Sequence, residues 1–187
     1  MSDNKKKKLS RFDPKSRWVK YDKESQLWIP SRKRIFLHWF KFLQHAEKDN
    51  SRQVDWKKYE GWGGANYILG TKFDEFWEQN WKEIFGVKNE GDEPKFSLST
   101  KQPKADGIRY ALLVYENLHR GDNWKIAQWI AKREDQKRGA GVGGSFFYAR
   151  DDVDSDFEMK QIMQSRVGRY KTASKKYLDN VCKGIFP

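Results

Sequence analysis

The sequence has little cysteine, proline and methionine, and it lacks a long apolar run. Its 187 residues include 1 Cys, 5 Pro and 3 Met. The single cysteine, Cys182, excludes a disulfide framework and is typical of a reducing compartment, so we expect a cytoplasmic protein. No apolar run approaches the ~18 residues that a membrane-spanning helix needs, so no membrane partner is expected. The basic N-terminal residues have no apolar segment after them, which predicts the absence of a signal peptide.

Aromatic residues and positive charge are the features present in excess. The chain has 9 Trp, 8 Tyr and 12 Phe, together 16% of its residues, which is too many for a wholly disordered protein. Its 38 Lys and Arg exceed its 26 Asp and Glu, and the formal net charge is +12. The length is typical of one domain, with or without a small subdomain.

The positive charge is clustered along the chain. Residues 1–34 carry 12 basic and 4 acidic side chains, and the ranges 120–150 and 155–187 each carry 7 and 3. Residues 71–93 carry 3 basic and 7 acidic side chains. Clustered positive charge releases counterions when it meets phosphate, so the pattern favours a nucleic-acid partner, either DNA or RNA. An acidic protein or an acidic membrane surface is the alternative.

Apolar residues recur at helical spacing in five segments. They predict helices over residues 32–48, from Thr71 to the residue before Gly86, and over 105–119, 123–137 and 155–183. Short extended pieces are expected at 18–21 and 26–29, and loops over 49–64 and 87–103. Capping boxes are predicted at Thr71 with Asp74 and at Ser155 with Glu158, and Gly168 is expected to kink or divide the last helix. The predicted fold class is mainly α, with a disordered basic arm over 1–17, a Trp-rich helical region over 18–103 and a basic region over 104–187.

The last region has the pattern of a helix-turn-helix. A short turn with Gly121 joins the segments 105–119 and 123–137, and the stretch from Arg166 to Ala173 is similar to a recognition helix. Arginine can read guanine through two parallel hydrogen bonds, whereas lysine and threonine contact phosphates. A plain surface helix is the alternative. The candidate nucleic-acid contacts are Lys5, Lys6, Lys7, Lys8, Arg11, Lys132, Arg133, Lys137, Arg138, Arg150, Arg166, Arg169, Lys171, Thr172, Lys175 and Lys176.

Four tryptophans outside the helical stripes are candidates for stacking on bases or contacting a protein partner. They are Trp18, Trp28, Trp56 and Trp62, and their alternative role is to hold loops against the core. Trp39, Phe40, Trp77, Trp81, Trp124 and Trp129 lie on helical stripes and are expected in the core.

The sequence predicts no enzyme, cofactor or metal site. The acidic residues Asp151, Asp152, Asp154, Asp156 and Glu158 invite a metal hypothesis. However, Phe157 and Met163 stand where an EF-hand needs Gly and Glu, and helix capping explains the cluster. Gly139, Gly141 and Gly144 match G-x-G-x-x-G, but they follow a charged helix and not a strand, so a phosphate-contacting loop or a plain linker is expected.

Three segments carry a resemblance. The segments from Val54 to Tyr59 and from Phe73 to Glu78, together with the tail from Val167 to Pro187, resemble small basic, Trp-rich proteins of bacteriophages and mobile elements. The resemblance implies a viral source and assigns no functional residue.

Three hypotheses follow from the sequence. The first is a non-enzymatic DNA- or RNA-binding protein that contacts phosphates through its basic helices and N-terminal arm. The second is a phage protein-interaction factor, either an inhibitor of a host complex or a virion component, that binds through aromatic loops. The third is a metal-dependent nuclease that uses the acidic residues between 151 and 158.

Overall fold

The computed structural model describes residues 19–30, 33–89, 92, 94–96, 98, 99, 104–139 and 156–187. Within these residues the protein is mainly helical, which confirms the predicted fold class. The helices are α2 (Lys33–Lys48), α3 (Gly64–Gly70), α4 (Phe73–Phe85), α5 (Ala105–Glu116), α6 (Asn123–Gly139) and α7 (Asp156–Val181), with the 3-10 turns η1 (Trp56–Tyr59) and η2 (Leu118–Arg120). None of the helices in the described ranges is long and apolar enough to cross a membrane.

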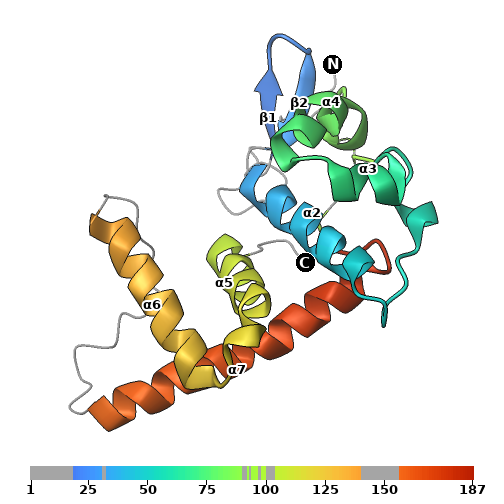
Figure 1. Ribbon diagram of the computed structural model, residues 1–187. Helices are drawn as coiled ribbons and strands as arrows, with labels where there is room; N and C mark the ends of the chain where they lie inside the picture. The colour runs from blue at the N-terminus through green and yellow to red at the C-terminus, as the bar shows by residue number, and fades with distance from the viewer. Residues whose placement is uncertain are drawn as a thin grey trace, which may run out of the picture.

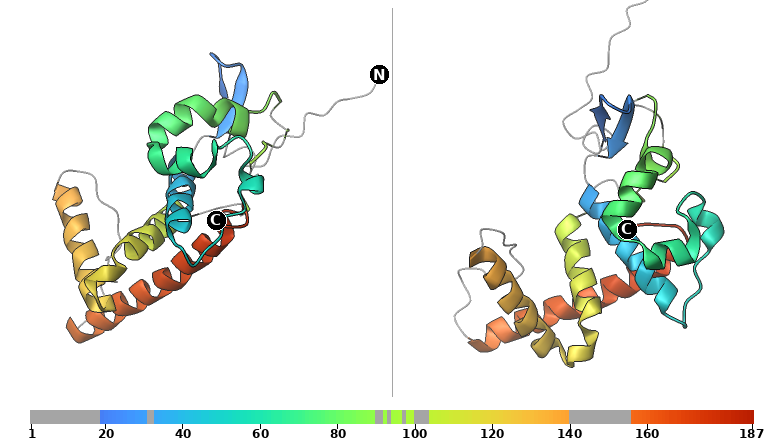
Figure 2. Two further views of the ribbon diagram at one scale, coloured as in Figure 1. Left: turned by 45° about the vertical axis from the view of Figure 1, so that its right-hand side comes forward. Right: turned by 45° about the horizontal axis from the view of Figure 1, so that its top comes forward.

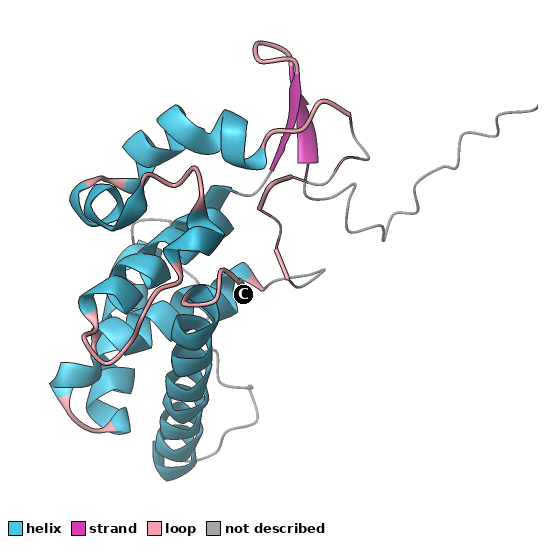
Figure 3. Ribbon diagram, turned by 90° about the vertical axis from the view of Figure 1, so that its right-hand side faces the viewer, coloured by secondary structure: helices cyan, strands magenta, loops and turns pink. Residues whose placement is uncertain are grey.

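The two extended pieces pair as an antiparallel hairpin, β1 (Val19–Asp22) and β2 (Leu27–Pro30). The carboxylate of Asp22 accepts hydrogen bonds from the backbone N and the Oγ of Ser25 at 3.0 and 2.6 Å, which closes the turn. Trp28 exchanges two backbone hydrogen bonds, of 2.8 and 3.0 Å, with Val87 just after α4. The hairpin is therefore fixed beside α4 (Figure 3).

The larger hydrophobic core surrounds Trp39 on α2. The apolar stripe predicted for this helix is buried, and the Trp39 ring lies 5.3 Å from the Trp62 ring and 5.5 Å from the Phe186 ring. The indole Nε1 of Trp39 donates to the Tyr59 hydroxyl at 3.1 Å, and that hydroxyl donates to the Val181 carbonyl at 2.6 Å. Helix α2, η1 and the end of α7 thus meet in one core.

Helix α7 runs beneath α5, α6 and α2 and joins two hydrophobic clusters (Figures 1 and 2). Its C-terminal part, with Leu178 and Val181, belongs to the core around Trp39, whereas Met163 and Val167 belong to a smaller cluster with α5 and α6. The larger cluster also contains residues of α5, so it crosses the boundary predicted at residue 103.

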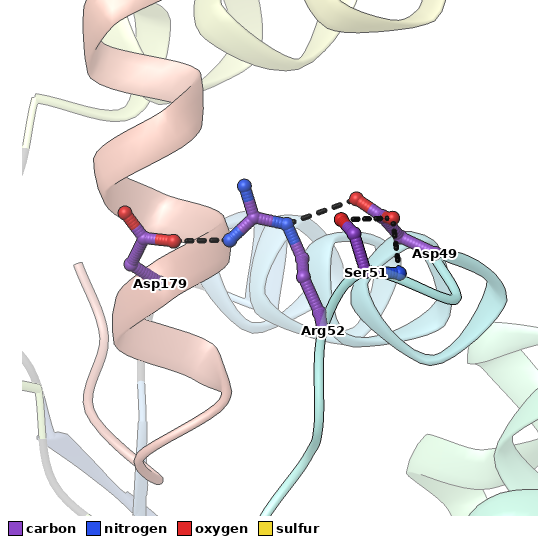
Figure 4. Close-up of polar contacts among 4 residues, drawn as sticks. All are labelled: Asp49, Ser51, Arg52 and Asp179. Carbon is purple, nitrogen blue, oxygen red and sulfur yellow. Dashed lines mark hydrogen bonds and ion pairs between the residues drawn. The ribbon is translucent and has the colours of Figure 1, made fainter.

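A polar network fastens the loop after α2 to the end of α7 (Figure 4). The guanidinium of Arg52 donates through Nε to Asp49 Oδ2 at 3.0 Å and through Nη1 to Asp179 Oδ1. Asp49 also accepts from the hydroxyl and the backbone N of Ser51, and these hydrogen bonds hold the pKa of Asp49 below its usual value. Asp179 is therefore engaged within the fold.

Three local features differ from the predictions. The capping box at Thr71 and Asp74 is wrong, because α4 begins at Phe73 after Lys72, which provides no side-chain cap. Helix α3 was not predicted, since its seven residues include one fully buried apolar side chain, Ile68, and so show no periodic stripe. Gly168 does not divide α7, which runs through it to Val181.

Candidate nucleic-acid interface

Helices α6 and α7 pack through their apolar sides, which leaves their polar sides outward. The buried residues Ile126, Ala127 and Ile130 of α6 meet Met163 and Val167 of α7 in the smaller cluster. The helical period then places side chains on the opposite side of each helix in contact with solvent. The two helices therefore present two separate outer surfaces.

A buried ion pair holds α6 against α5. Glu134 is 3% exposed, and its carboxylate accepts from the Arg109 Nη1 and Nη2 at 2.8 and 3.1 Å and from the Tyr110 hydroxyl at 3.2 Å. Burial raises the pKa of Tyr110 to about 12. Because Arg109 neutralises Glu134, this acidic residue does not offset the positive charge on the outer side of α6.

The outer side of α6 combines a tryptophan with basic residues. Lys125, Trp129 and Lys132 have the spacing i, i+4, i+7 and so form one stripe. The guanidinium of Arg120, from η2, lies 4.5 Å from the Trp129 ring centroid, and that of Arg133 lies 5.2 Å from it. The four basic residues are exposed and Trp129 is partly buried. We name these five residues the α6 surface.

The outer side of α7 carries Arg169, Thr172 and Lys176 at the spacing i, i+3, i+7, with Lys175 beside them. All four are exposed, and we name them the α7 surface. The Thr172 hydroxyl lies 3.3 Å from the Gly168 carbonyl of the preceding turn, to which it donates. Because the Thr172 hydroxyl already donates its proton within the helix, it does not donate to a phosphate in this arrangement, although the sequence predicts that contact.

The predicted recognition stretch also has an inner side. Val167 is fully buried and Tyr170 packs against both hydrophobic clusters. Arg166 and Lys171 are partly buried at its edges. Of the candidate contacts in this stretch, Arg169 and Thr172 therefore face solvent most fully.

Charge is separated between the two ends of the molecule. Helix α6 has five basic and two acidic residues and α7 has six and three, whereas α4 has one basic and four acidic residues. Helix α4 lies at the end of the molecule away from α6 and the first half of α7 (Figures 1 and 2). The local positive charge at the α6 end is therefore not cancelled by α4.

Several candidate residues lie outside the described residues. These are Lys5, Lys6, Lys7, Lys8, Arg11, Trp18 and Arg150, together with most of the glycine motif after Gly139 and of the acidic cluster before Glu158. Lys137 and Arg138 belong to α6, but their side chains are not among those that the structure describes.

The remaining candidate tryptophans contact the protein itself. Trp62 is fully buried, so it is not available to a base or a partner, and its alternative role of holding a loop against the core is the observed one. Trp56 is partly buried and its Nε1 donates to Glu47 Oε2 at 3.0 Å. Trp28 is partly buried in β2, 5.5 Å from the Tyr21 ring.

The histidines contribute to packing and to one ion pair. His38 is 5% exposed on α2, and neither ring nitrogen has a hydrogen-bond partner among the described residues. His45 Nε2 lies 3.3 Å from Glu116 Oε1. In the described part of the chain, no group of three His, Cys, Asp or Glu side chains is arranged to hold a metal ion.

Three residues of the α6 surface were not predicted from the sequence: Arg120, Lys125 and Trp129. Trp129 was assigned to the core, and its ring does pack against the smaller cluster, but the same ring contacts two guanidiniums. The i, i+4 spacing of Trp129 and Arg133 is a signal for such a contact, because side chains four apart on a helix are neighbours.

Comparison with protein-family models, with curated proteins and with solved structures gave no match. The interpretation of the two basic surfaces therefore depends on their own geometry and charge.

Proposed function

We propose that this protein binds nucleic acid through the α6 surface and the α7 surface. The observation that carries the proposal is the separation of charge, with exposed basic residues on α6 and α7 and the acidic helix α4 at the other end. A surface of this kind gains free energy by releasing counterions from phosphates, and its field orients the protein as it approaches.

The basic residues on the two surfaces are available for this contact. Arg169, Lys175 and Lys176 form no ion pair with another described residue, and the nearby carboxylate of Asp179 pairs with Arg52. The basic residues are spread along α7. A phosphate backbone, which carries charges at regular intervals, matches this spacing better than an acidic protein with a single compact patch does. Both DNA and RNA fit this proposal.

Three finer predictions from the sequence belong to the same proposal. They are the helix-turn-helix role of α5, α6 and α7, the tracking of phosphates by the arm over residues 1–17, and the bacteriophage setting. In the first of these, Arg169 and Lys176 would lie against the DNA groove, since both point away from the packed side of α7.

Neutralising the α7 surface should weaken nucleic-acid binding. The triple variant R169Q/K175Q/K176Q removes three exposed charges, each able to contact one phosphate. We expect an affinity loss of about tenfold or more at ~0.1 M salt, and a slope of log affinity against log salt that is less steep by about 2 to 3. Fluorescence anisotropy with labelled duplex DNA, single-stranded DNA and RNA measures both quantities.

The matched control removes the same charge from the other end. Lys72, Lys82 and Lys88 are exposed residues before, in and after α4, and K72Q/K82Q/K88Q has the same net charge as the α7 variant. The control should stay within about threefold of the wild type. Equal losses in the two variants would show that overall charge, and not the α7 surface, determines binding.

A further inference from the structure

The Trp129 ring holds two arginine side chains that come from different elements. Arg120 belongs to η2 and Arg133 to α6, and their guanidinium carbons lie 4.5 and 5.2 Å from the ring centroid. Cation–π contacts of this length restrict the guanidiniums to the neighbourhood of the indole. Two planar, permanently charged groups therefore contact the same indole ring on the α6 surface.

Arg120 is fixed by a second contact. Its Nε donates to Asn117 Oδ1 at 2.6 Å, and Asn117 is itself 5% exposed and donates through Nδ2 to the Leu113 carbonyl at 2.7 Å. The two terminal nitrogens of Arg120 have no partner among the described residues. The end of α5 thus orients this guanidinium while leaving its outer donors unused.

Arg133 also lacks an ion pair with a described residue. The carboxylate of Glu116 is close enough for Arg133 to influence it, but Glu116 pairs with His45. Burial alone would raise the pKa of Glu116, whereas its hydrogen bond with His45 and the charges of Lys41, His45 and Arg133 lower it. Glu116 is therefore charged and already has a partner.

We propose that Arg120 and Arg133, positioned by Trp129, form a clamp for one phosphate group of a nucleic-acid backbone. The inference rests on the proposed function, and it identifies the residues that hold one phosphate most specifically. Guanidinium groups bind phosphate oxygens through paired N–H donors, which a lysine ammonium does not reproduce. Because the ring has already ordered both side chains, less freedom is lost on binding.

The test replaces each arginine with lysine, which keeps the charge and removes the planar donors. The probes are a labelled single-stranded oligonucleotide, its duplex and a single strand with an abasic centre. R120K/R133K should weaken binding to all three about tenfold, since hydrogen bonds to a charged group are lost. The control R34K changes an exposed arginine of α2 that lies outside the α6 and α7 surfaces and has no ring contact among the described residues, so binding should stay within about twofold of the wild type.

Trp129→Leu gives the second measurement, because it keeps an apolar side chain for the smaller cluster but removes the ring. It should weaken binding to all three probes about as much as R120K/R133K, and adding R133K to it should have little further effect, because the two changes disrupt one unit. Thermal unfolding of each variant reports whether the fold is kept, and the lysine variants provide the test if Trp129→Leu unfolds.

Two results would overturn the clamp while leaving the proposed function intact. One is binding by R120K/R133K that stays as close to the wild type as binding by R34K does. The other is a loss of affinity in Trp129→Leu that is confined to the intact single strand and absent for the duplex and the abasic strand. That pattern would show that Trp129 stacks on a base and does not position a phosphate clamp. Failure of the wild type to bind any probe would overturn the proposed function and the clamp together.

Discussion

Replacing Trp62 with alanine should lower the free energy of unfolding by about 3–5 kcal/mol, the usual cost of removing a large buried aromatic side chain. Trp62 is fully buried, and its ring lies 5.0 Å from Phe76, 5.2 Å from Tyr59, 5.3 Å from Trp39 and 5.5 Å from Phe96. Its removal leaves a cavity that these rings cannot all move to fill. Chemical denaturation followed by circular dichroism measures the loss.

Two further variants make this prediction specific. Trp56→Ala should cost less, about 1–2 kcal/mol, since Trp56 is partly buried and loses one hydrogen bond to Glu47 and part of its packing against Tyr59. Trp62→Phe should cost less than Trp62→Ala, because it keeps a ring and removes an indole N–H that has no partner among the described residues. A Trp62→Ala protein as stable as the Trp56→Ala protein would contradict this description of the core.

The protein should lose stability as the pH falls from 6.5 to about 4, through the titration of His38. Burial is the main cause that lowers the pKa of His38 from 6.5 to about 4, and the charges of Lys41, Arg34 and Arg109 lower it further, against the opposite effect of Glu116. In this interval the unfolded chain binds a proton that the folded protein does not, so acid favours unfolding. The stabilisation that comes from neutral, buried His38 is fully present above pH 6.5. At pH 4 the free energy of unfolding should be lower by about 3 kcal/mol.

Denaturation midpoints of the wild type and of His38→Leu, measured at intervals from pH 7.5 to 4, test this expectation. The variant lacks the imidazole, so its stability should change far less between pH 6.5 and 4.5. Below that, Glu116 adds its own acid response in both proteins, because its pKa is lower when folded and its ion pair is lost on protonation. A wild type with equal stability at pH 7 and pH 5 would show that His38 is not held neutral.

Helices α2, α4, α5, α6 and α7 were predictable because each has an apolar stripe several turns long. The segment 32–48 has buried residues at helical spacing, and the structure places α2 at Lys33–Lys48. Helix α3 and the buried position of Trp62 were not predictable by the same reasoning. A seven-residue helix shows too few turns of pattern, and the burial of Trp62 depends on rings from α2, α4 and η1 that meet only in the folded chain.

The candidate site was predictable in its charge but not in its geometry. The basic segments of 120–150 and 155–187 were evident from composition, and they correspond to α6 and the 156–187 segment. The sequence could not show that α6 and α7 pack through their apolar sides, which divides the positive charge into two surfaces. Nor could it show that Arg120, nine residues before Trp129, shares the same ring as Arg133.

The salt dependence of nucleic-acid binding by the wild type tests the central claim most directly. The α6 and α7 surfaces together carry seven basic residues, and two of them, Arg120 and Arg133, are proposed to share one phosphate. With six phosphates contacted, log affinity plotted against log salt should have a slope of about −5 for duplex DNA and about −4 for single strands. Binding should then weaken about a thousandfold between 50 and 200 mM salt. A flat salt response, or no binding at 50 mM salt to DNA or RNA, would contradict the account.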